Sequence, residues 1–310
     1  MESRCRSIDF TLGLDSACGK SGWPSLKAPP IVIAANHAMP HTSDTSATPT
    51  RSVSEAQELS QVGSTVLRNA WDPNHLAILR TAIVAYDDRR RERVTKGDAA
   101  PSERMYTTHG VGTFAGLVHG RLVEPGLLPQ MFQGSPFQAL CEAYFNCDEF
   151  YASPNRLGFR IHYTSVSDRS FIPYHQDSYT QDVRTPRVLN CWMPLDPGAG
   201  IDAPGLEVVR NTCRPDFPRK DFGLRSENAA YDFITIDRDR IIEDYGDNFM
   251  APEFEVGDGL VFTENVIHRT YVTPEMTKPR INFEFRVFPT NSLPPGVTIA
   301  DFGGSLIRVS

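Results

Sequence analysis

The chain has 310 residues, enough for one large domain or two small ones with a substantial core. Its hydrophobic fraction of 40% and aromatic fraction of 10% are ordinary for a globular protein, and the formal charge of −7 argues against a general nucleic-acid binder. No apolar run approaches the roughly 18 residues of a membrane span, and the 6 scattered cysteines lack a CxxC pair, so we expect a soluble cytoplasmic protein that binds neither membrane nor nucleic acid.

Residues 1–52 are rich in Ser, Thr, Pro, Ala and Gly, which predicts a flexible N-terminal arm. The composition changes near Ser54, where a helix start is expected, and "STVLRN" then alternates like a short strand. The clearest helix is "DPNHLAILRTAIVAYDDRRRER", with Asp72 as N-cap and Pro73 at its first position. Its apolar face consists of Leu76, Leu79, Ile83 and Tyr86. A second helix is expected over 135–146, again after a Ser-Pro pair.

From about residue 156 the pattern changes to short segments rich in β-branched and aromatic residues. These segments are "RLGFRIHYTSV", "RVLNCWMPL", "GLEVVR", "YDFITID", "GDGLVFTENVIHRTYV" and "RINFEFRVF". Helices followed by about eight strands, without βαβ alternation or a phosphate loop, argue against a doubly wound nucleotide fold. We predict a mostly β protein with flanking helices, built on a double-stranded β-helix (jelly-roll, cupin-like) core. One domain over 53–310 would comprise a helical part, 53–150, and a jelly-roll core, 151–290.

A histidine and an aspartate two positions apart in "PYHQDSYTQD" are candidate metal ligands. On a strand, residues i and i+2 point to the same face, so His175 and Asp177 can both address one ion. His268, at the end of "GDGLVFTENVIH", can supply a third ligand from another strand. Two imidazoles and one carboxylate form the facial triad of non-haem Fe(II) oxygenases. For the HxD pair alone, polar residues on a solvated strand are the alternative interpretation.

Four stretches resemble the phytanoyl-CoA dioxygenase-like Fe(II)/2-oxoglutarate oxygenases, over about residues 55 to 290. They are "SQVGSTVLRNAWDPNHLAILRTAI", "YHQDS", "LNCWMPLDPGAGIDAPGLEVVRN" and "GDGLVFTENVIHRTYVTPEMTKPRINFEF". The chain departs from the family pattern after the distal histidine, where "RTYVT" replaces the frequent S-x-x-N, and after "VV", where "RNTCRPD" replaces P-G-S-H. The resemblance implies that His175, Asp177 and His268 hold Fe(II), with 2-oxoglutarate and O2 as cosubstrates.

The resemblance also implies an arginine for the far carboxylate of 2-oxoglutarate. Arg280, twelve residues after His268, is the preferred candidate, because a guanidinium fork holds a carboxylate through two parallel hydrogen bonds. The alternation of "RINFEFRV" puts Arg286 on the same face, so Arg286 is the competing candidate.

Four further residues are candidates for lining the cofactor pocket, with packing in the sheet as the alternative for each. They are Asn190 and Trp192 on one face of "VLNCWMPL", and Tyr163 or Arg160 on the preceding predicted strand.

The implied function is hydroxylation or a related oxidation of an unactivated C–H bond in a small molecule, with release of succinate and CO2. Halogenation is not expected, because related halogenases leave the position of Asp177 open for chloride. The resemblance suggests small-molecule substrates, often of secondary metabolism. Two alternatives remain open: a non-catalytic β-helix binding protein, and a cupin-type metalloenzyme that does not use 2-oxoglutarate.

Overall fold

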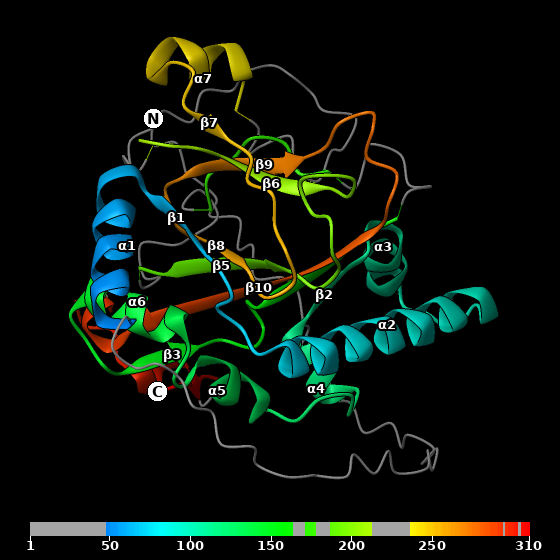
Figure 1. Ribbon diagram of the computed structural model, residues 1–310. Helices are drawn as coiled ribbons and strands as arrows, with labels where there is room; N and C mark the ends of the chain where they lie inside the picture. Colours follow the sequence, from blue (N-terminus) through cyan, green and yellow to red (C-terminus); the bar gives the residue numbers. More distant parts are fainter. Residues whose placement is uncertain (1–47, 164–170, 178–186, 213–235, 294, 303–304) are drawn as a thin grey trace, which may run out of the picture. The chain divides into compact units, whose positions relative to one another are not determined.

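The computed structural model describes residues 48–163, 171–177, 187–212, 236–293, 295–302 and 305–310 (Figure 1). These residues belong to one compact unit, Ala47–Ser310. Residues 1–47 lie outside the described part, so the flexible arm stays a prediction, and so does the division of the chain at residue 52. That boundary falls inside the first described helix.

Helices prevail in the first part of the described chain and strands in the rest. The helices are α1 (Thr48–Val62), α2 (Pro73–Lys96), α3 (Pro101–His109), α4 (Phe114–His119), α5 (Leu127–Phe132), α6 (Pro136–Phe145) and α7 (Arg238–Tyr245), with 3-10 turns η3 (Thr290–Ser292) and η4 (Ile299–Phe302). The strands are β1 (Ser64–Leu67), β2 (Val111–Thr113), β3 (Phe150–Ala152), β4 (Gly158–His162), β5 (Leu189–Pro194), β6 (Gly205–Val209), β7 (Phe249–Met250), β8 (Gly259–Thr263), β9 (Ile267–Tyr271), β10 (Arg280–Pro289) and β11 (Ile307–Arg308).

The described strands form two antiparallel sheets. The larger sheet has the order β1-β8-β5-β10-β3-β11, with β4 paired to β10 and β2, and the smaller sheet has the order β7-β6-β9. Figure 1 shows β6 and β9 across from β5, β8 and β10. Apolar side chains of both sheets meet in one cluster, with Trp192 and Leu260 from the larger sheet and Leu206 and Val208 from β6. Two facing antiparallel sheets are the arrangement of a jelly roll, which confirms the predicted fold class.

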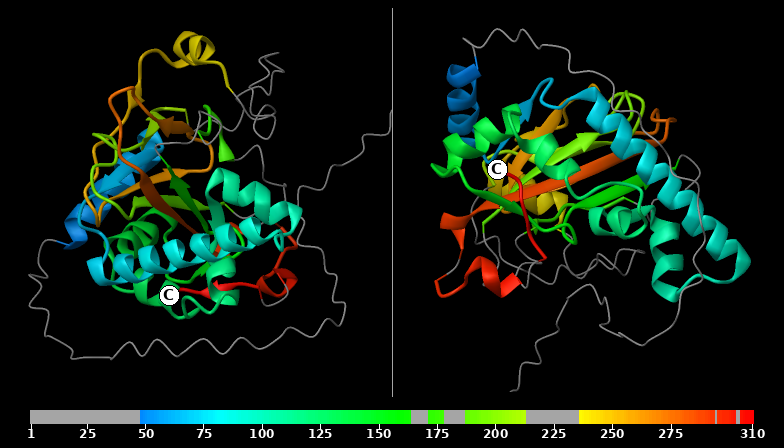
Figure 2. Two further views of the ribbon diagram at one scale, coloured as in Figure 1. Left: turned by 90° about the vertical axis from the view of Figure 1, so that its right-hand side faces the viewer. Right: turned by 90° about the horizontal axis from the view of Figure 1, so that it is seen from below.

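Strand β10 has one apolar and one polar face. Successive side chains of a strand point to opposite sides, so its sequence RINFEFRV divides into two sets. The residues packed in the main core with α2, α4, α5 and α6 are Ile281, Phe283, Phe285 and Val287. The residues on the opposite face are Arg280, Asn282, Glu284 and Arg286. Figure 2 shows α2 crossing the sheet on the helical side. The polar face of β10 is therefore turned toward the smaller sheet.

The two helices with clear sequence signals are confirmed. The Asp72 carboxylate accepts a hydrogen bond from Asn74 N at the start of α2, and Gly97, in the left-handed conformation at φ 78°, ends it. The Ser135 hydroxyl accepts from Gln138 N at the start of α6. The helix start near Ser54 is wrong, since α1 begins at Thr48.

The helices α3, α4, α5 and α7 were not anticipated, because six to nine residues show little periodicity. The predicted strand "YDFITID" lies mostly outside the described residues, and its last residue, Asp237, is the N-cap of α7. Within the described ranges, no helix combines the length and apolar composition that a bilayer crossing requires.

Candidate metal centre

His175 and Asp177 lie in the segment 171–177, which is not a regular strand. His175 forms an isolated antiparallel bridge with His268 of β9, through backbone hydrogen bonds of 3.0 and 2.9 Å. Gln176 turns to the other side, and its amide donates to two backbone carbonyls. The strand predicted for this segment is thus wrong. The direction of the side chains nevertheless alternates as in a strand, so His175 and Asp177 point to the same place.

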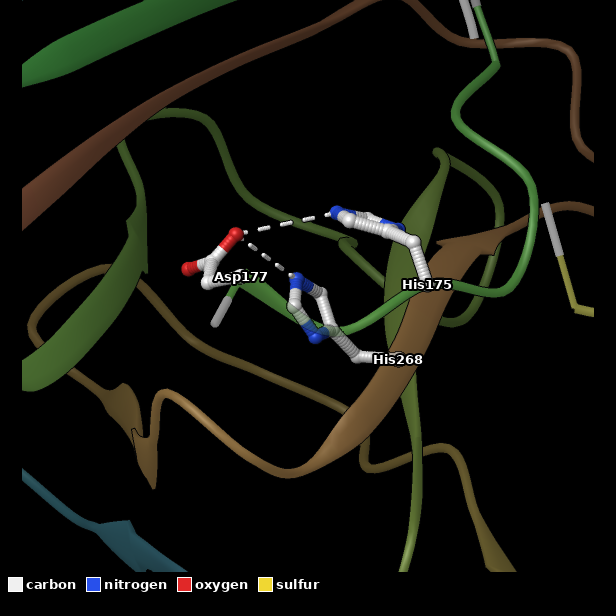
Figure 3. A group of neighbouring side chains, drawn as sticks. All are labelled: His175, Asp177 and His268. Carbon is white, nitrogen blue, oxygen red and sulfur yellow. Dashed lines mark ion pairs between the residues drawn. The ribbon is translucent and has the colours of Figure 1, made fainter. Parts of the chain in front are cut away.

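The three predicted ligands come together. Their ligand atoms all lie within 4.8 Å of one another, and all three residues are buried. The Asp177 Oδ1 atom is 3.8 Å from His175 Nε2 and 3.9 Å from His268 Nε2, and Figure 3 shows both rings turned toward that oxygen. One ion about 2 Å from each ligand fits such a spacing after small side-chain movements.

Backbone carbonyls fix the tautomer of both imidazoles. His175 Nδ1 lies 2.8 Å from Pro173 O, and His268 Nδ1 lies 2.9 Å from Val266 O. A carbonyl oxygen only accepts, so each Nδ1 carries the proton and each Nε2 keeps a free lone pair. Burial, together with His268, lowers the pKa of His175 to about 3. The His175 imidazole is therefore neutral near pH 7, as a metal ligand must be.

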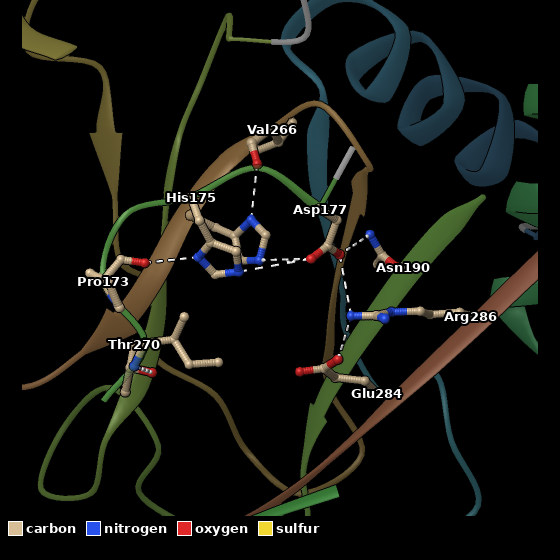
Figure 4. A network of polar contacts seen from close by, with 10 residues as sticks. Pro173, His175, Asp177, Asn190, Val266, Thr270, Glu284 and Arg286 are labelled. Atoms are coloured by element: carbon tan, nitrogen blue, oxygen red, sulfur yellow. Dashed lines mark hydrogen bonds and ion pairs between the residues drawn. The ribbon is translucent and has the colours of Figure 1, made fainter. Parts of the chain in front are cut away.

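The Asp177 carboxylate is held on its other oxygen. Its Oδ2 accepts from Asn190 Nδ2 at 3.0 Å and from Arg286 Nη2 at 3.3 Å, and Arg286 also donates to Glu284 Oε2 at 2.7 Å (Figure 4). Burial alone would raise the pKa of Asp177, but Arg286, the two histidines and Asn190 lower it. Two imidazoles that present Nε2 and an ionised carboxylate are a donor set that fits Fe(II).

Arg280 lies on the same face of β10 but in different surroundings. Its side chain is 2% exposed, and its Nη1 donates to Pro204 O and Gly205 O, both at 3.0 Å. The guanidinium carbon lies 4.9 Å from the centre of the Trp192 ring. Within the described residues Arg280 forms no ion pair, and its Nε has no hydrogen-bond partner. Burial, and next the positive charge of Arg160, lowers the pKa of Arg280 to about 9, although Glu284 and Asp196 act in the opposite direction.

Two residues near these groups were missed by the sequence reasoning. His162, 1% exposed, accepts a hydrogen bond from Arg280 Nη2 through Nδ1 and stacks on Phe171 with ring centres 5.5 Å apart. Thr270 is buried, and its hydroxyl oxygen accepts from Ile172 N at 3.1 Å, which leaves the hydroxyl proton available for donation. The signal for Thr270 was its i+2 spacing from His268, which puts both side chains on one face of β9.

Tyr163 is not brought to the metal centre. Its hydroxyl donates to the Asp87 carboxylate of α2, and its ring lies 4.3 Å under the Arg91 guanidinium carbon. It lines a cavity of about 390 Å³ whose lining residues include none of the three ligands. The expectation that Tyr163 lines the cofactor pocket is corrected, because His162 faces the other sheet and the next residue must face the helices.

The other pocket candidates lie on the inner face of the larger sheet. Asn190 contacts Asp177, whereas Trp192, 2% exposed, packs on Phe254 and supports Arg280. Arg160 is paired with Asn282 across β4 and β10, so it shares a face with Arg280. Trp192 thus belongs to the core between the sheets, and its ring packs against the Arg280 guanidinium.

A family model described as phytanoyl-CoA dioxygenase matches residues 59–272. No curated protein matches the chain by sequence. EvdO2 from Micromonospora carbonacea var. aurantiaca, complexed with 2-oxoglutarate, is similar with a TM-score of 0.52 and 16% identity, over 78% of this chain and 94% of that one.

Two further solved structures are similar. The non-heme alpha ketoglutarate dependent carbocyclase SnoK from nogalamycin biosynthesis has a TM-score of 0.52 and 12% identity, over 83% of this chain and 96% of that one. EctD from S. alaskensis with bound Fe has a TM-score of 0.51 and 14% identity, over 82% of each chain. At these identities the likeness establishes a shared fold.

Proposed function

Because the chain belongs to the phytanoyl-CoA dioxygenase family of non-haem iron, 2-oxoglutarate-dependent oxygenases, we propose that it oxidises an unactivated C–H bond of a small organic molecule. When bound, iron and 2-oxoglutarate together with O2 supply the oxidising power, and succinate and CO2 are the coproducts. The single observation that carries the proposal is the convergence of two imidazoles and one carboxylate in a buried place.

His175, Asp177 and His268 are the proposed iron ligands. Each histidine offers Nε2, because its Nδ1 is occupied by a backbone carbonyl. Asp177 offers Oδ1, because Oδ2 is already hydrogen-bonded. The three ligands come from one side of the ion and leave the opposite side for the cosubstrate.

Arg280 is the proposed partner for the far carboxylate of 2-oxoglutarate. A buried guanidinium is costly unless an anion pairs with it, and within the described residues no carboxylate forms an ion pair with Arg280. Arg286, in contrast, is already engaged with two carboxylates, Asp177 and Glu284. The Thr270 hydroxyl can donate a further hydrogen bond to the same carboxylate. The His162 and Trp192 rings keep water away from Arg280, which strengthens its attraction for an anion.

The substrate is proposed to be a small, partly polar molecule, and the similarity to a carbocyclase of nogalamycin biosynthesis favours secondary metabolism. Buried polar atoms on the inner face, among them Asn282 Oδ1 and Asn190 Oδ1, lack a hydrogen-bond partner within the described residues. Such atoms can accept hydrogen bonds from hydroxyl or amide groups of a ligand.

We propose the cytosol as the location of the protein, since Cys141, Cys147 and Cys191 are free thiols. Cell fractionation tests this proposal.

The experiment is an assay of succinate formed from 2-oxoglutarate in air, with Fe(II) supplied and a panel of small-molecule substrates. Wild-type protein is expected to form succinate, whereas Asp177→Ala and His268→Ala should form none above background. Asp88→Ala, an exposed carboxylate of α2, is the matched control and should retain full turnover. Near wild-type turnover in either variant would contradict the assignment of the replaced residue as an iron ligand.

The same purified protein also distinguishes the proposed oxygenase from the two alternative functions. A cupin-type enzyme that does not use 2-oxoglutarate would bind iron but show no change of melting temperature on adding 2-oxoglutarate. A binding protein without catalysis would form no succinate with any substrate. We expect 2-oxoglutarate to raise the melting temperature only in the presence of a divalent metal.

A further inference from the structure

The Asp177 carboxylate is fixed on the side that faces away from the histidines. Oδ2 accepts the hydrogen bonds from Asn190 at 3.0 Å and Arg286 at 3.3 Å, whereas Oδ1 faces the two Nε2 atoms at 3.8 and 3.9 Å. A carboxylate can bind a metal ion through one oxygen or through both. With Oδ2 held by these two donors, Oδ1 is the oxygen directed at the two imidazoles and thus at the place of the ion.

The two donors come from adjacent strands of the larger sheet. Asn190 on β5 and Arg286 on β10 are directly paired in the sheet register. Asp177 itself lies in a segment without a regular strand, held to β9 by the bridge at His175. The larger sheet therefore supplies an orientation that the local backbone of Asp177 does not (Figure 4).

Glu284 keeps this arrangement from placing a net positive charge beside the ion. The Arg286 Nη2 atom that reaches Asp177 also donates to Glu284 Oε2 at 2.7 Å. An unpaired guanidinium would repel a divalent cation and draw charge away from the ligating carboxylate. The Arg286–Glu284 pair is neutral as a whole, so it can orient Asp177 with little electrostatic cost.

Building on the proposed function, we infer that Asn190, Arg286 and Glu284 are positioning residues that restrict Asp177 to one-oxygen coordination of the metal. One-oxygen coordination leaves more of the ion's coordination sphere for the cosubstrate. This role also separates the two arginines of β10: Arg286 acts on the metal ligand, and Arg280 acts on the cosubstrate.

The test is metal binding rather than turnover. Fe(II), without oxygen, and Co(II) are titrated into the metal-free protein in competition with a chromophoric chelator, and the visible spectrum of the Co(II) protein reports its coordination. In the double variant Glu284→Gln with Arg286→Gln the net charge is unchanged, so a change in affinity reports the lost orientation. We expect affinity to fall about 10- to 100-fold, with an altered Co(II) spectrum. The metal affinity of the Asn190→Ala variant should decrease as well.

Two comparisons separate positioning from a general structural role. Arg286→Lys keeps a donor and a charge, so it should recover most of the affinity. Arg240→Gln removes a surface guanidinium that pairs with Glu243 and Asp244 on α7, and it should behave as wild type. The melting temperature of each metal-free variant identifies those that fail to fold. If the double variant is among them, Asn190→Ala and Arg286→Lys decide the outcome.

The outcomes are distinct. A wild-type protein that binds neither Fe(II) nor Co(II) would end the proposed function itself. A wild-type protein that binds both, with folded variants of equal affinity and unchanged Co(II) spectrum, would overturn the positioning role alone. Tighter binding by the double variant would overturn it as well, because the pair would then oppose the metal.

Discussion

At the scale of single residues, Arg280 and Arg286 illustrate how surroundings separate two identical side chains. They lie six positions apart on one face of β10. Among the described residues, Arg286 forms ion pairs with two carboxylates, whereas the hydrogen-bond acceptors of Arg280 are carbonyls and an imidazole. A buried cation with neutral acceptors attracts any anion that fits. This difference, rather than the position along the strand, makes Arg280 the candidate for a dicarboxylate.

Replacing Arg280 by Gln is expected to weaken 2-oxoglutarate binding by at least about 10-fold, because a charge-assisted pair is lost. Arg280→Lys should recover part of the loss, since it keeps the charge but not the fork. The measurement is the shift of melting temperature with 2-oxoglutarate at saturating Mn(II). Fe(II) affinity without 2-oxoglutarate should stay unchanged. An equal loss of metal affinity would place Arg280 in the metal site instead.

The low pKa of His175 predicts acid sensitivity of the metal-free protein. Burial, and next the neighbouring His268, lowers the pKa of His175 from 6.5 to about 3. Between these two pH values the unfolded chain binds a proton at this residue and the folded protein does not. Stability is thus independent of this group above pH 6.5 and falls by up to roughly 1.4 kcal/mol per pH unit as pH decreases toward 3. Urea unfolding of metal-free wild type and His175→Gln at several pH values measures the difference. Parallel pH profiles would contradict the prediction.

At the scale of elements, the sequence "GDG" before β8 has a structural explanation for each residue. Gly257 adopts φ 107°, a conformation that favours glycine. A Cβ on Gly259 would lie 2.8 Å from Cys191 Sγ, so only glycine fits beside β5. The Asp258 carboxylate accepts from Arg68 Nη1 at 2.6 Å, Asn69 N at 3.0 Å and Glu255 N at 3.1 Å. The motif therefore joins the end of β1 to the start of β8.

Asp258→Asn is expected to destabilise the protein by about 1–3 kcal/mol, because a buried acceptor of three hydrogen bonds is weakened. Burial alone would raise the pKa of Asp258, but the hydrogen bonds from Asn69, Glu255 and Arg68 lower it below 3.8. The stabilisation by the ionised Asp258 is thus fully present above pH 3.8 and is lost as the pH falls through the lowered pKa of Asp258. Urea unfolding at pH 7 measures the change, with the exposed Asp88→Asn as control. A loss no greater than the control's would refute the role of the turn.

At the scale of the whole described unit, the three ligands connect the two sheets. His268 belongs to β9 of the smaller sheet, whereas Asp177 is hydrogen-bonded to β5 and β10 of the larger one. The sheets also meet through the apolar cluster around Trp192 and Leu206 and through the hydrogen bonds from Arg280 to Pro204 O and Gly205 O. An ion bound by the triad would therefore cross-link the jelly roll.

Metal binding is expected to stabilise the fold by about 2.7 kcal/mol at a free concentration 100 times the dissociation constant. The effect should be largest in β6 and β9, whose amides should exchange with solvent more slowly once Mn(II) is added. Hydrogen exchange followed by mass spectrometry, with and without a chelator, measures this. Protection spread evenly over both sheets, or absent in both, would contradict the cross-link.

The sequence by itself determined the features that depend on neighbouring residues. The Asp72 and Ser135 caps, the alternation of β10 and the i+2 spacing of His175 and Asp177 are local patterns, and all of these side chains lie where the patterns predict. The backbone at 171–177 was predicted as a strand, but Pro173 has no N–H to donate. Among the described residues the segment forms an isolated bridge at His175 and one further backbone hydrogen bond to β9, from Thr270 N to Ile172 O.

Only the tertiary structure decided which polar groups meet. That Asn190 and Arg286 hold Asp177, that Arg280 lacks a counter-ion within the described chain, and that Tyr163 turns to α2 all follow from how the sheets and helices face one another. The physical reason is the distance along the chain between the residues that must interact. Periodicity fixes the face on which a side chain lies, whereas its partner across the gap is fixed only when two distant segments pack.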